Sequence, residues 1–220
     1  MLLLLLDEGW EFEAIYCDHG CDLPATRRFV YWLSRHTPIT ILRPSVEGFN
    51  NLYEYCWHTK TIPLTIHRSC TDKFKIRVIR KYCQKPAFEL IGISTDESHR
   101  ARIRCDGGLE SRYPLIEYSL HREDCKQIIR EHGIPVPPKS GCWFCPMQPL
   151  KSWRELRREH PELFCKAKQL EERSNNYRRS QGKTFTGLRG IEGKTLENIV
   201  DEDQGELFEE YAYPPCRCEL

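Results

Sequence analysis

The chain has 220 residues, 40% of them hydrophobic and 30% charged, so it can bury one good core but hardly two. Its formal net charge of +1 argues against a strongly basic nucleic-acid-binding surface. The apolar run at residues 1–6 is far shorter than the roughly 20 residues that cross a bilayer, and we expect no membrane association. Twelve cysteines without a signal peptide predict a reduced, cytoplasmic protein in which closely spaced cysteines serve metal or redox chemistry.

The first half of the chain alternates predicted helices and strands. In order, we expect a helix end closed by Gly9, a strand at 12–17, a helix capped by Asp22 through 36, a strand at 39–42, an aromatic-rich helix or crossover at 49–58, a helix from Thr71 or Asp72 to 83 and a strand at 88–93. This alternation predicts an α/β fold with a Rossmann-like, doubly wound, mostly parallel sheet. In such sheets ligands bind at the carboxyl ends of the strands.

The second half is predicted to be more helical and irregular. We expect a short strand at 100–104, a docking segment at 114–116, helices at 122–132, 150–160 and 161–173, a loop at 174–187 and an acidic tail at 201–210. We therefore divide the chain into a nucleotide-binding α/β domain at 1–120 and a helical, cysteine-bearing, metal-binding region at 121–220. The two are expected to pack as one unit.

The strongest local signal is the pair Cys142-x-x-Cys145. Two thiolates two residues apart, between Gly141 and Pro146, form a tight knuckle that can share one metal. The two aromatic residues between them would shield a metal centre from water. A redox dithiol and plain burial are the alternatives.

Two cysteines do not complete a tetrahedral site, so further ligands must come from elsewhere. Cys70 is the third candidate, because it lies just ahead of a predicted helix amino terminus that would favour the thiolate. The fourth is Cys165, Cys216 or Cys218, and we favour the terminal pair and choose Cys218. The remaining cysteines considered are expected to be small buried hydrophobic residues: Cys17, Cys56, Cys83, Cys105 and Cys125.

A second constellation is Asp18-His19-Gly20, at the end of the predicted strand 12–17. The glycine lets the backbone approach a ligand, and Asp18 can hydrogen-bond a ribose or orient a base. An ordinary turn with a capping aspartate is the alternative.

A third constellation is a set of cations on the predicted helix 71–83 and just before it: Arg68, Lys73, Lys75, Arg77 and Arg80. Such residues can clamp phosphate or sulfate groups near Cys70. Helical spacing puts Lys73, Arg77 and Arg80 on a similar face, with Ile76 and Ile79 turned to the core. A solvated helix face is the alternative.

A fourth constellation follows the predicted strand 88–93. It comprises Ser94, Asp96, Glu97, Ser98 and Arg100, and it falls where the active site of an α/β protein is built. Arg100 and Arg102 can neutralise a polyphosphate, whereas a capped turn is the alternative reading.

Taken in order, these pieces resemble the 3'-phosphoadenosine 5'-phosphosulfate (PAPS) reductase-like branch of the adenine-nucleotide α-hydrolase, or ATP-pyrophosphatase, superfamily. The resemblance runs from about residue 2 to 172. It rests on Asp18-His19-Gly20, on residues 70–76, on residues 92–100, on Tyr113-Pro114-Leu115-Ile116-Glu117 and on the run KSGCWFCP, followed by a Trp-containing helix and Pro161-Glu162-Leu163-Phe164.

The resemblance implies a sheet that binds ATP or PAPS with Mg²⁺, and cleavage between the α and β phosphates or sulfur transfer as the chemistry. It places Asp18, His19, Gly20, Ser94, Asp96, Glu97 and Ser98 at the nucleotide and gives catalytic roles to Cys70, Lys75 and Arg100. The cysteine pattern is similar to that of DNA-phosphorothioation sulfurtransferases and mobile-element relatives, so a [4Fe-4S] cluster is expected ahead of zinc. The implied partners are a nucleic acid or small sulfur acceptor and a cysteine desulfurase.

Two departures from the family pattern favour an alternative. Members begin with a strand and a Ser-Gly-Gly-x-Asp-Ser pyrophosphate loop that these 220 residues do not supply. Sulfonucleotide reductases use a cysteine in a carboxyl-terminal Glu-Cys-Gly context, whereas this chain ends Cys216-Arg217-Cys218-Glu219-Leu220. A truncated, non-catalytic, metal-stabilised binding or regulatory protein is therefore the second hypothesis.

Overall fold

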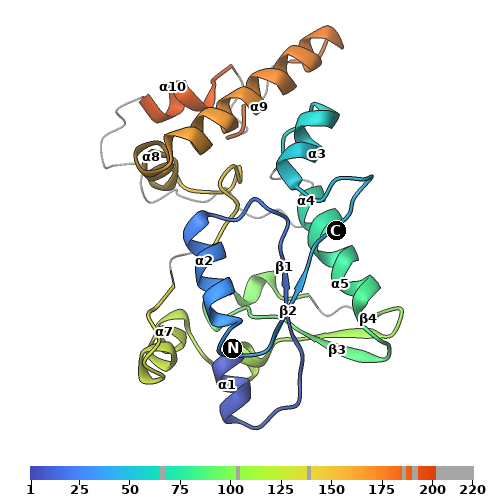
Figure 1. The fold of residues 1–220 in the computed structure, drawn as a ribbon, viewed down its shortest axis with the longest axis vertical. Helices are drawn as coiled ribbons and strands as arrows, with labels where there is room; N and C mark the ends of the chain where they lie inside the picture. The colour runs from blue at the N-terminus through green and yellow to red at the C-terminus, as the bar shows by residue number, and fades with distance from the viewer. Residues whose placement is uncertain (65–67, 103–104, 138–139, 185–186, 190–192, 202–220) are drawn as a thin grey trace.

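The computed structural model describes residues 1–64, 68–102, 105–137, 140–184, 187–189 and 193–201 (Figure 1). Its strands are β1 (Ala14–Cys17), β2 (Ile39–Leu42), β3 (Ala87–Leu90), β4 (Cys105–Asp106) and β5 (Leu109–Arg112). Its helices are α1 (Leu2–Asp7), α2 (Pro24–Leu33), α3 (Leu52–Thr59), α4 (Ser69–Thr71), the π-helix η1 (Asp72–Ile76), α5 (Arg77–Tyr82), the 3₁₀ helix η2 (Thr95–Arg100), α6 (Pro114–Glu117), α7 (Arg122–Glu131), α8 (Leu150–Glu159), α9 (Pro161–Ser180) and α10 (Leu196–Asp201). The fold is mixed α/β. Within these ranges no helix has the length and apolar character needed to span a membrane.

The strands form two separate sheets. β1 pairs with β2 in parallel, in the register Ala14↔Ile39 to Cys17↔Leu42. The second sheet has the order β3-β5-β4, in which β3 and β5 are parallel and the short β4 is antiparallel to β5. The described residues therefore do not form the single doubly wound sheet that the sequence predicts.

A cavity of about 1260 Å³ explains why the sheet is split. Residues of β1 and β3 both line it, so no strand of the described chain lies between them to join the two sheets. Much of its lining is apolar and includes Ile15, Ile79 and Leu90. Parallel strands can pair only at about 4.8 Å, so each sheet ends at this cavity.

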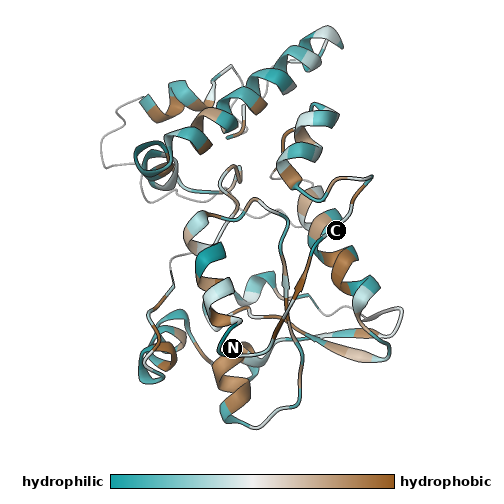
Figure 2. Cartoon of the chain, viewed as in Figure 1, coloured by the Kyte–Doolittle hydropathy of each residue, from teal (hydrophilic) through white to brown (hydrophobic). Residues whose placement is uncertain are grey.

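The helices lie in two groups (Figure 1). α2 lies on one side of β1 and β2 and α5 on the other, while α8, α9 and α10 form a helical group at the end of the molecule away from β3 and β4. Figure 2 shows hydrophobic residues on α1 and on the strands, and mainly hydrophilic residues along the outer part of α9.

Two helix boundaries differ from the sequence prediction. The N-cap of α2 is Leu23, without a side-chain cap, because Asp22 instead accepts a hydrogen bond from Tyr16. α9 continues to Ser180, so the predicted loop at 174–187 is wrong over its first half. Polar residues continue this helix because Ser174 and Asn175 are buried against its neighbours rather than solvated.

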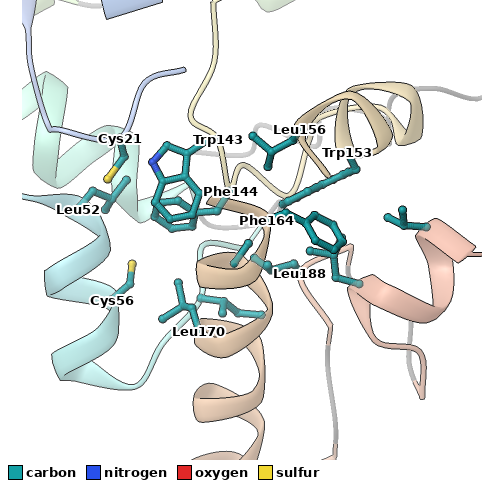
Figure 3. Packing of buried hydrophobic residues seen from close by; sticks show 14 of the residues in the cluster. Cys21, Leu52, Cys56, Trp143, Phe144, Trp153, Leu156, Phe164, Leu170 and Leu188 are labelled. Carbon is teal, nitrogen blue, oxygen red and sulfur yellow. The ribbon is translucent and has the colours of Figure 1, made fainter. Parts of the chain in front are cut away.

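One hydrophobic cluster joins the two halves of the chain (Figure 3). It includes Cys21, Leu52 and Phe74 from the first half and Phe144, Trp153, Leu170, Leu188 and Leu196 from the second. Burying a side chain of this size contributes about 1.5–3 kcal/mol. The described parts of the two halves of the chain are therefore held together by a shared core.

Glu171 anchors the segments that cover α9. This carboxylate is 3% exposed and accepts backbone N–H groups from Leu188 at 2.7 Å and from Leu196 at 2.9 and 3.1 Å. Burial raises its pKa, although the two backbone donors oppose the shift. These hydrogen bonds hold α10 and residues 187–189 against α9, but they require the carboxylate to be removed from water.

We predict that Glu171→Gln lowers the free energy of unfolding by about 1–3 kcal/mol at pH 5. The NH₂ group of the new glutamine would face a backbone N–H, and two donors cannot form a hydrogen bond. The pKa of Glu171 is raised in the folded state, so the folded protein binds this proton more tightly than the unfolded chain does. The free energy of unfolding of the wild type therefore falls as the pH rises from 5 to 8. The deficit of Glu171→Gln should therefore shrink between pH 5 and pH 8 in urea unfolding. Exposed Glu172→Gln is the control, and a deficit that grows with pH would contradict the prediction.

Candidate metal and nucleotide site

The turn after β1 pairs with the cysteine knuckle. Leu23 N–H donates to the Gly141 carbonyl at 2.8 Å, and Trp143 N–H donates to the Cys21 carbonyl at 3.0 Å. Asp22 and Cys142 form an antiparallel bridge between these two bonds. Two segments some 120 residues apart, which the sequence assigns to nucleotide and metal binding, therefore lie side by side.

The knuckle itself is a tight turn. Cys145 N–H donates to the Cys142 carbonyl at 3.0 Å, and Gln148 N–H donates to the Cys145 carbonyl at 3.2 Å. Trp143 and Phe144 are buried in the shared core, and their tilted rings pack with centroids 4.6 Å apart. Shielding of a metal centre by these two residues stays a prediction.

Cys21 is a site residue that sequence reasoning missed. It is fully buried, and its Sγ lies 3.2 Å from the Tyr53 N–H at the start of α3 and 3.3 Å from Asn51 Oδ1. Burial opposes its ionisation, but hydrogen bonds from Cys142, His19 and the Tyr53 amide lower its pKa to about 6. Burial and the adjacent Cys21 raise the pKa of Cys142 well above its usual value. The pair therefore favours one thiolate and one thiol.

Cys70 lies near the other end of the knuckle. It is half-buried in α4 and packs against the shared core, within the first helical turn rather than ahead of it. Burial raises the pKa of Cys145, and the charge of Cys70 raises it further, while Arg68 and Lys75 lower it. Cys70 and two cations thus lie within electrostatic reach of Cys145.

The thiols gather without forming a finished metal site. Within the described ranges, no three His, Cys, Asp or Glu side chains are arranged as a ready ligand set. Cys21, Cys70, Cys142 and Cys145 contact or influence one another in pairs, and their soft sulfur donors suit zinc or an iron–sulfur cluster. The residues present therefore fit such a group by donor type, and their side chains would have to move together to bind it.

The other cysteines divide as follows. Cys17 and Cys56 are buried, as the sequence predicts, and burial raises their pKa values to about 11 and about 12. Cys83 and Cys125 are only half-buried, so their predicted full burial is wrong. Cys165 is exposed on α9. Cys216 and the predicted ligand Cys218 lie outside the part of the chain that the structure describes, and so does the side chain of Cys105.

A charged network connects Cys21 to the cations of the η1 helix. His19 Nε2 lies 3.4 Å from Asp22 Oδ1, Tyr16 OH donates to Asp22 Oδ2 at 2.6 Å, and Lys75 Nζ lies 3.9 Å from Asp22 Oδ1. Burial alone would raise the pKa of Asp22, but His19 and Lys75 hold it below its usual value.

The same network charges His19. Burial opposes protonation, but Asp22 and Cys21 raise the pKa of His19 to about 9. A protonated ring carries hydrogen on both nitrogens, so the 3.3 Å contact of Nδ1 with the Cys21 amide is then not a hydrogen bond. The ring of His19 can therefore accept the Cys21 N–H when neutral, or pair with the Asp22 carboxylate as a cation when protonated.

The carboxylate of Asp18 is already occupied by protein groups. It accepts Gly20 N–H and Arg27 Nη2, each at 2.9 Å, and Tyr31 OH at 2.7 Å. Burial raises its pKa, but these donors lower it below the usual value. Asp18 therefore positions the turn and α2, and a ribose would have to compete with Arg27 and Tyr31.

The fourth predicted constellation contacts α7. Ser94 is buried ahead of η2, whereas Ser98 is exposed. Asp96 Oδ1 lies 2.9 Å from His121 Nδ1, and Asp96 Oδ2 accepts the Arg122 N–H at 2.6 Å. These contacts of Asp96 lead to α7 rather than to the turn at 18–23.

Arg100 is placed differently from its neighbours. It pairs with Glu97 at 2.7 Å and lines the cavity between β1 and β3, as does Arg102. An anion entering the cavity would meet these guanidinium groups.

Three cations of the predicted clamp bond to different partners. Lys73 bonds Tyr55 OH at 2.6 Å and Glu47 at 3.2 Å, Arg77 pairs with Asp72 at 2.6 Å, and Lys75 faces Asp22. The π-turn of η1 adds a residue per turn, which rotates these side chains away from their α-helical positions. The spacing rules of an α-helix therefore do not apply across residues 72–76.

Gly20 packs against Asn51, so the turn after β1 supports the start of α3. Its φ of +76° disfavours any other residue, and an added Cβ would clash with the side chain of Asn51, which caps α3. We predict that Gly20→Ala lowers the free energy of unfolding by about 2 kcal/mol, combining backbone strain with loss of the cap. Gly9→Ala is the control, since its φ is +69° but nothing lies within 4 Å of an added Cβ. Equal losses in urea unfolding would refute the link to Asn51.

Comparisons with known proteins are sparse. No family model matches the chain, and no solved structure matches it. The chain is similar to the uncharacterized protein MJ0066 of Methanocaldococcus jannaschii, with 24% identity over 186 residues, which cover 76% of this chain. The match spans 37% of that protein's length.

Proposed function

We propose that the chain is a PAPS reductase-like, ATP-pyrophosphatase-type sulfur-transfer protein that binds ATP or a sulfonucleotide beside a thiolate-held metal centre. The observation that carries the proposal is the backbone pairing of the strand-end turn 18–23 with the knuckle 141–143. It sets a position typical of nucleotide binding in α/β proteins against a cluster of thiols. Sulfur chemistry on a nucleotide-activated acceptor needs both in one place.

The metal centre would be held by Cys70, Cys142 and Cys145, with a further ligand. A [4Fe-4S] cluster, or zinc as the alternative, suits these soft donors. A bound cluster would supply a site that holds or relays sulfur. The chain's own residues would exclude water from it through Trp143 and Phe144, which are buried over the knuckle.

The nucleotide would approach from the carboxyl end of β1. Lys75, which faces Asp22 in this turn, and Arg100 in the cavity wall would pair with its phosphates, accompanied by Mg²⁺. The acceptor would be a nucleic acid or a small molecule, and a cysteine desulfurase would be a fitting sulfur donor.

The finer, Rossmann-like arrangement of the sheet belongs to the same proposal. β1 and β3 are each parallel to their own neighbour and line the same cavity. A strand between them would join β2-β1 and β3-β5-β4 into one sheet. The loop after such a strand would then reach the position proposed for the nucleotide.

A second candidate is a non-catalytic, metal-stabilised binding or regulatory protein. The specific observation in its favour is that Asp18 already bonds Arg27 and Tyr31, and that Asp96 bonds α7. Two carboxylates assigned to the nucleotide are therefore engaged by the protein itself. On this view the metal stabilises the fold and no nucleotide is turned over.

The metal arm of the proposal is tested by anaerobic purification with iron, zinc and acid-labile sulfide analysis. We expect bound metal in the wild type, and Cys142→Ser or Cys145→Ser should lose it and lower the melting temperature, because metal binding is coupled to folding. Cys165→Ser is the matched control, since this thiol is exposed on α9. Unchanged metal content in Cys142→Ser would refute the assignment, and iron with sulfide would favour sulfur transfer over the second candidate.

The nucleotide arm is tested by calorimetric titration of ATP with Mg²⁺. Lys75→Met should weaken binding about tenfold, a loss of about 1.4 kcal/mol, through removal of one phosphate contact. Arg77→Met is the control on the neighbouring helical turn, because Arg77 is 70% exposed and pairs with Asp72. Equal affinity in both variants would contradict the role of Lys75, and no ATP binding by the wild type would support the second candidate.

A further inference from the structure

We propose that Cys21 is the fourth metal ligand, so that one site is built from Cys21, Cys70, Cys142 and Cys145. The inference rests on the proposed function, because it names the residue that completes that metal centre. It replaces the sequence-based choice of Cys218.

The backbone places Cys21 beside the knuckle. Trp143 N–H donates to the Cys21 carbonyl, and Asp22 bridges Cys142, so Cys21 is one residue from the paired position. Each of the two thiols, Cys21 and Cys142, shifts the pKa of the other, as expected of neighbouring groups. A metal ion that binds Cys142 would therefore meet Cys21 as the thiol next to the paired position.

The pocket around the Cys21 sulfur suits a metal-bound thiolate. Its Sγ lies 3.2 Å from the Tyr53 N–H, which can donate to it at the amino terminus of the eight-residue helix α3. Backbone N–H groups directed at ligand sulfurs are a common second shell of thiolate sites. In Figure 3 Cys21 lies next to Trp143 and Leu52, so the site would be closed to water on this side.

The local charge also fits four thiolates. Arg68 and Lys75 lie near enough to influence Cys145. A tetrathiolate site carries net negative charge with either zinc or a [4Fe-4S] cluster, and these two cations offset part of it. Each protonated thiol would release its proton to solvent on binding the metal, with no change in sulfur oxidation state.

Other nearby cysteines are placed less well. Cys17 Sγ lies 3.0 Å from the Phe74 carbonyl, at the end of β1. Cys56 belongs to the same core, but Figure 3 shows it on α3 on the side of Leu170 rather than beside Trp143. Cys56 is therefore the most demanding control.

The test is a titration of anaerobic, metal-free protein with Zn²⁺ alone, read by the shift in melting temperature and by bound zinc after desalting. Wild type should bind one zinc and gain stability. Cys21→Ser should melt at nearly the wild-type temperature without metal, yet its zinc affinity should fall at least 100-fold. Cys56→Ser and Cys218→Ser should both retain the zinc-dependent shift.

The outcomes separate this inference from the proposed function. Zinc binding that survives Cys21→Ser but is lost in Cys56→Ser or Cys218→Ser would overturn the role of Cys21 and leave the metal centre standing. Failure of the wild type to bind zinc or iron would overturn both. If Cys21→Ser does not fold, Cys21→His supplies a second test, since an imidazole that restores zinc binding supports ligation and a folded, metal-free Cys21→His refutes it.

Discussion

The pairing of residues 21–23 with 141–143 is the constraint on which the rest of the site depends. Two backbone hydrogen bonds, which make the bridge between Asp22 and Cys142, hold the strand-end turn against the knuckle. Their net stabilisation is only about 1 kcal/mol each. They matter because they close a chain loop of roughly 120 residues at one point and bring Cys21, His19 and Asp22 to the cysteine knuckle.

The pairing is maintained by the core on one side and by charge on the other. Trp143 and Phe144 insert into the cluster shared by both halves of the chain, so the knuckle cannot move without opening that cluster. On the opposite side, Asp22 is held by Tyr16, His19 and Lys75. A buried carboxylate needs such partners, and the same requirement aligns His19 with Cys21.

Local patterns in the sequence predicted much of the fold and part of the site. Strand β2 matches its prediction at both ends, and the tight Cys142-x-x-Cys145 turn is present, since both depend on neighbours along the chain. Cys21 was missed because a single cysteine has no spacing motif, and its partners come from residues 51–53 and 142. Asp22 was read as a helix cap because its tertiary partners Tyr16 and Lys75 are invisible to capping rules. The π-turn at 72–76 and the continuation of α9 to Ser180 likewise reflect tertiary packing overriding local preference.

The cavity between β1 and β3 bears on how the molecule opens. A two-stranded parallel pair such as β1–β2 is marginal on its own and relies on the helices packed against it. The helical group α8–α10 contributes Trp153, Leu170 and Leu196 to the fully buried side chains. The free energy of local opening should therefore differ along the molecule. Backbone amides of β1 and β3 should exchange with solvent through partial openings that leave the α9 region folded. The strand-end turn lies between these two regions, so its cysteines are at the boundary between a part of the chain that opens readily and a part that stays folded.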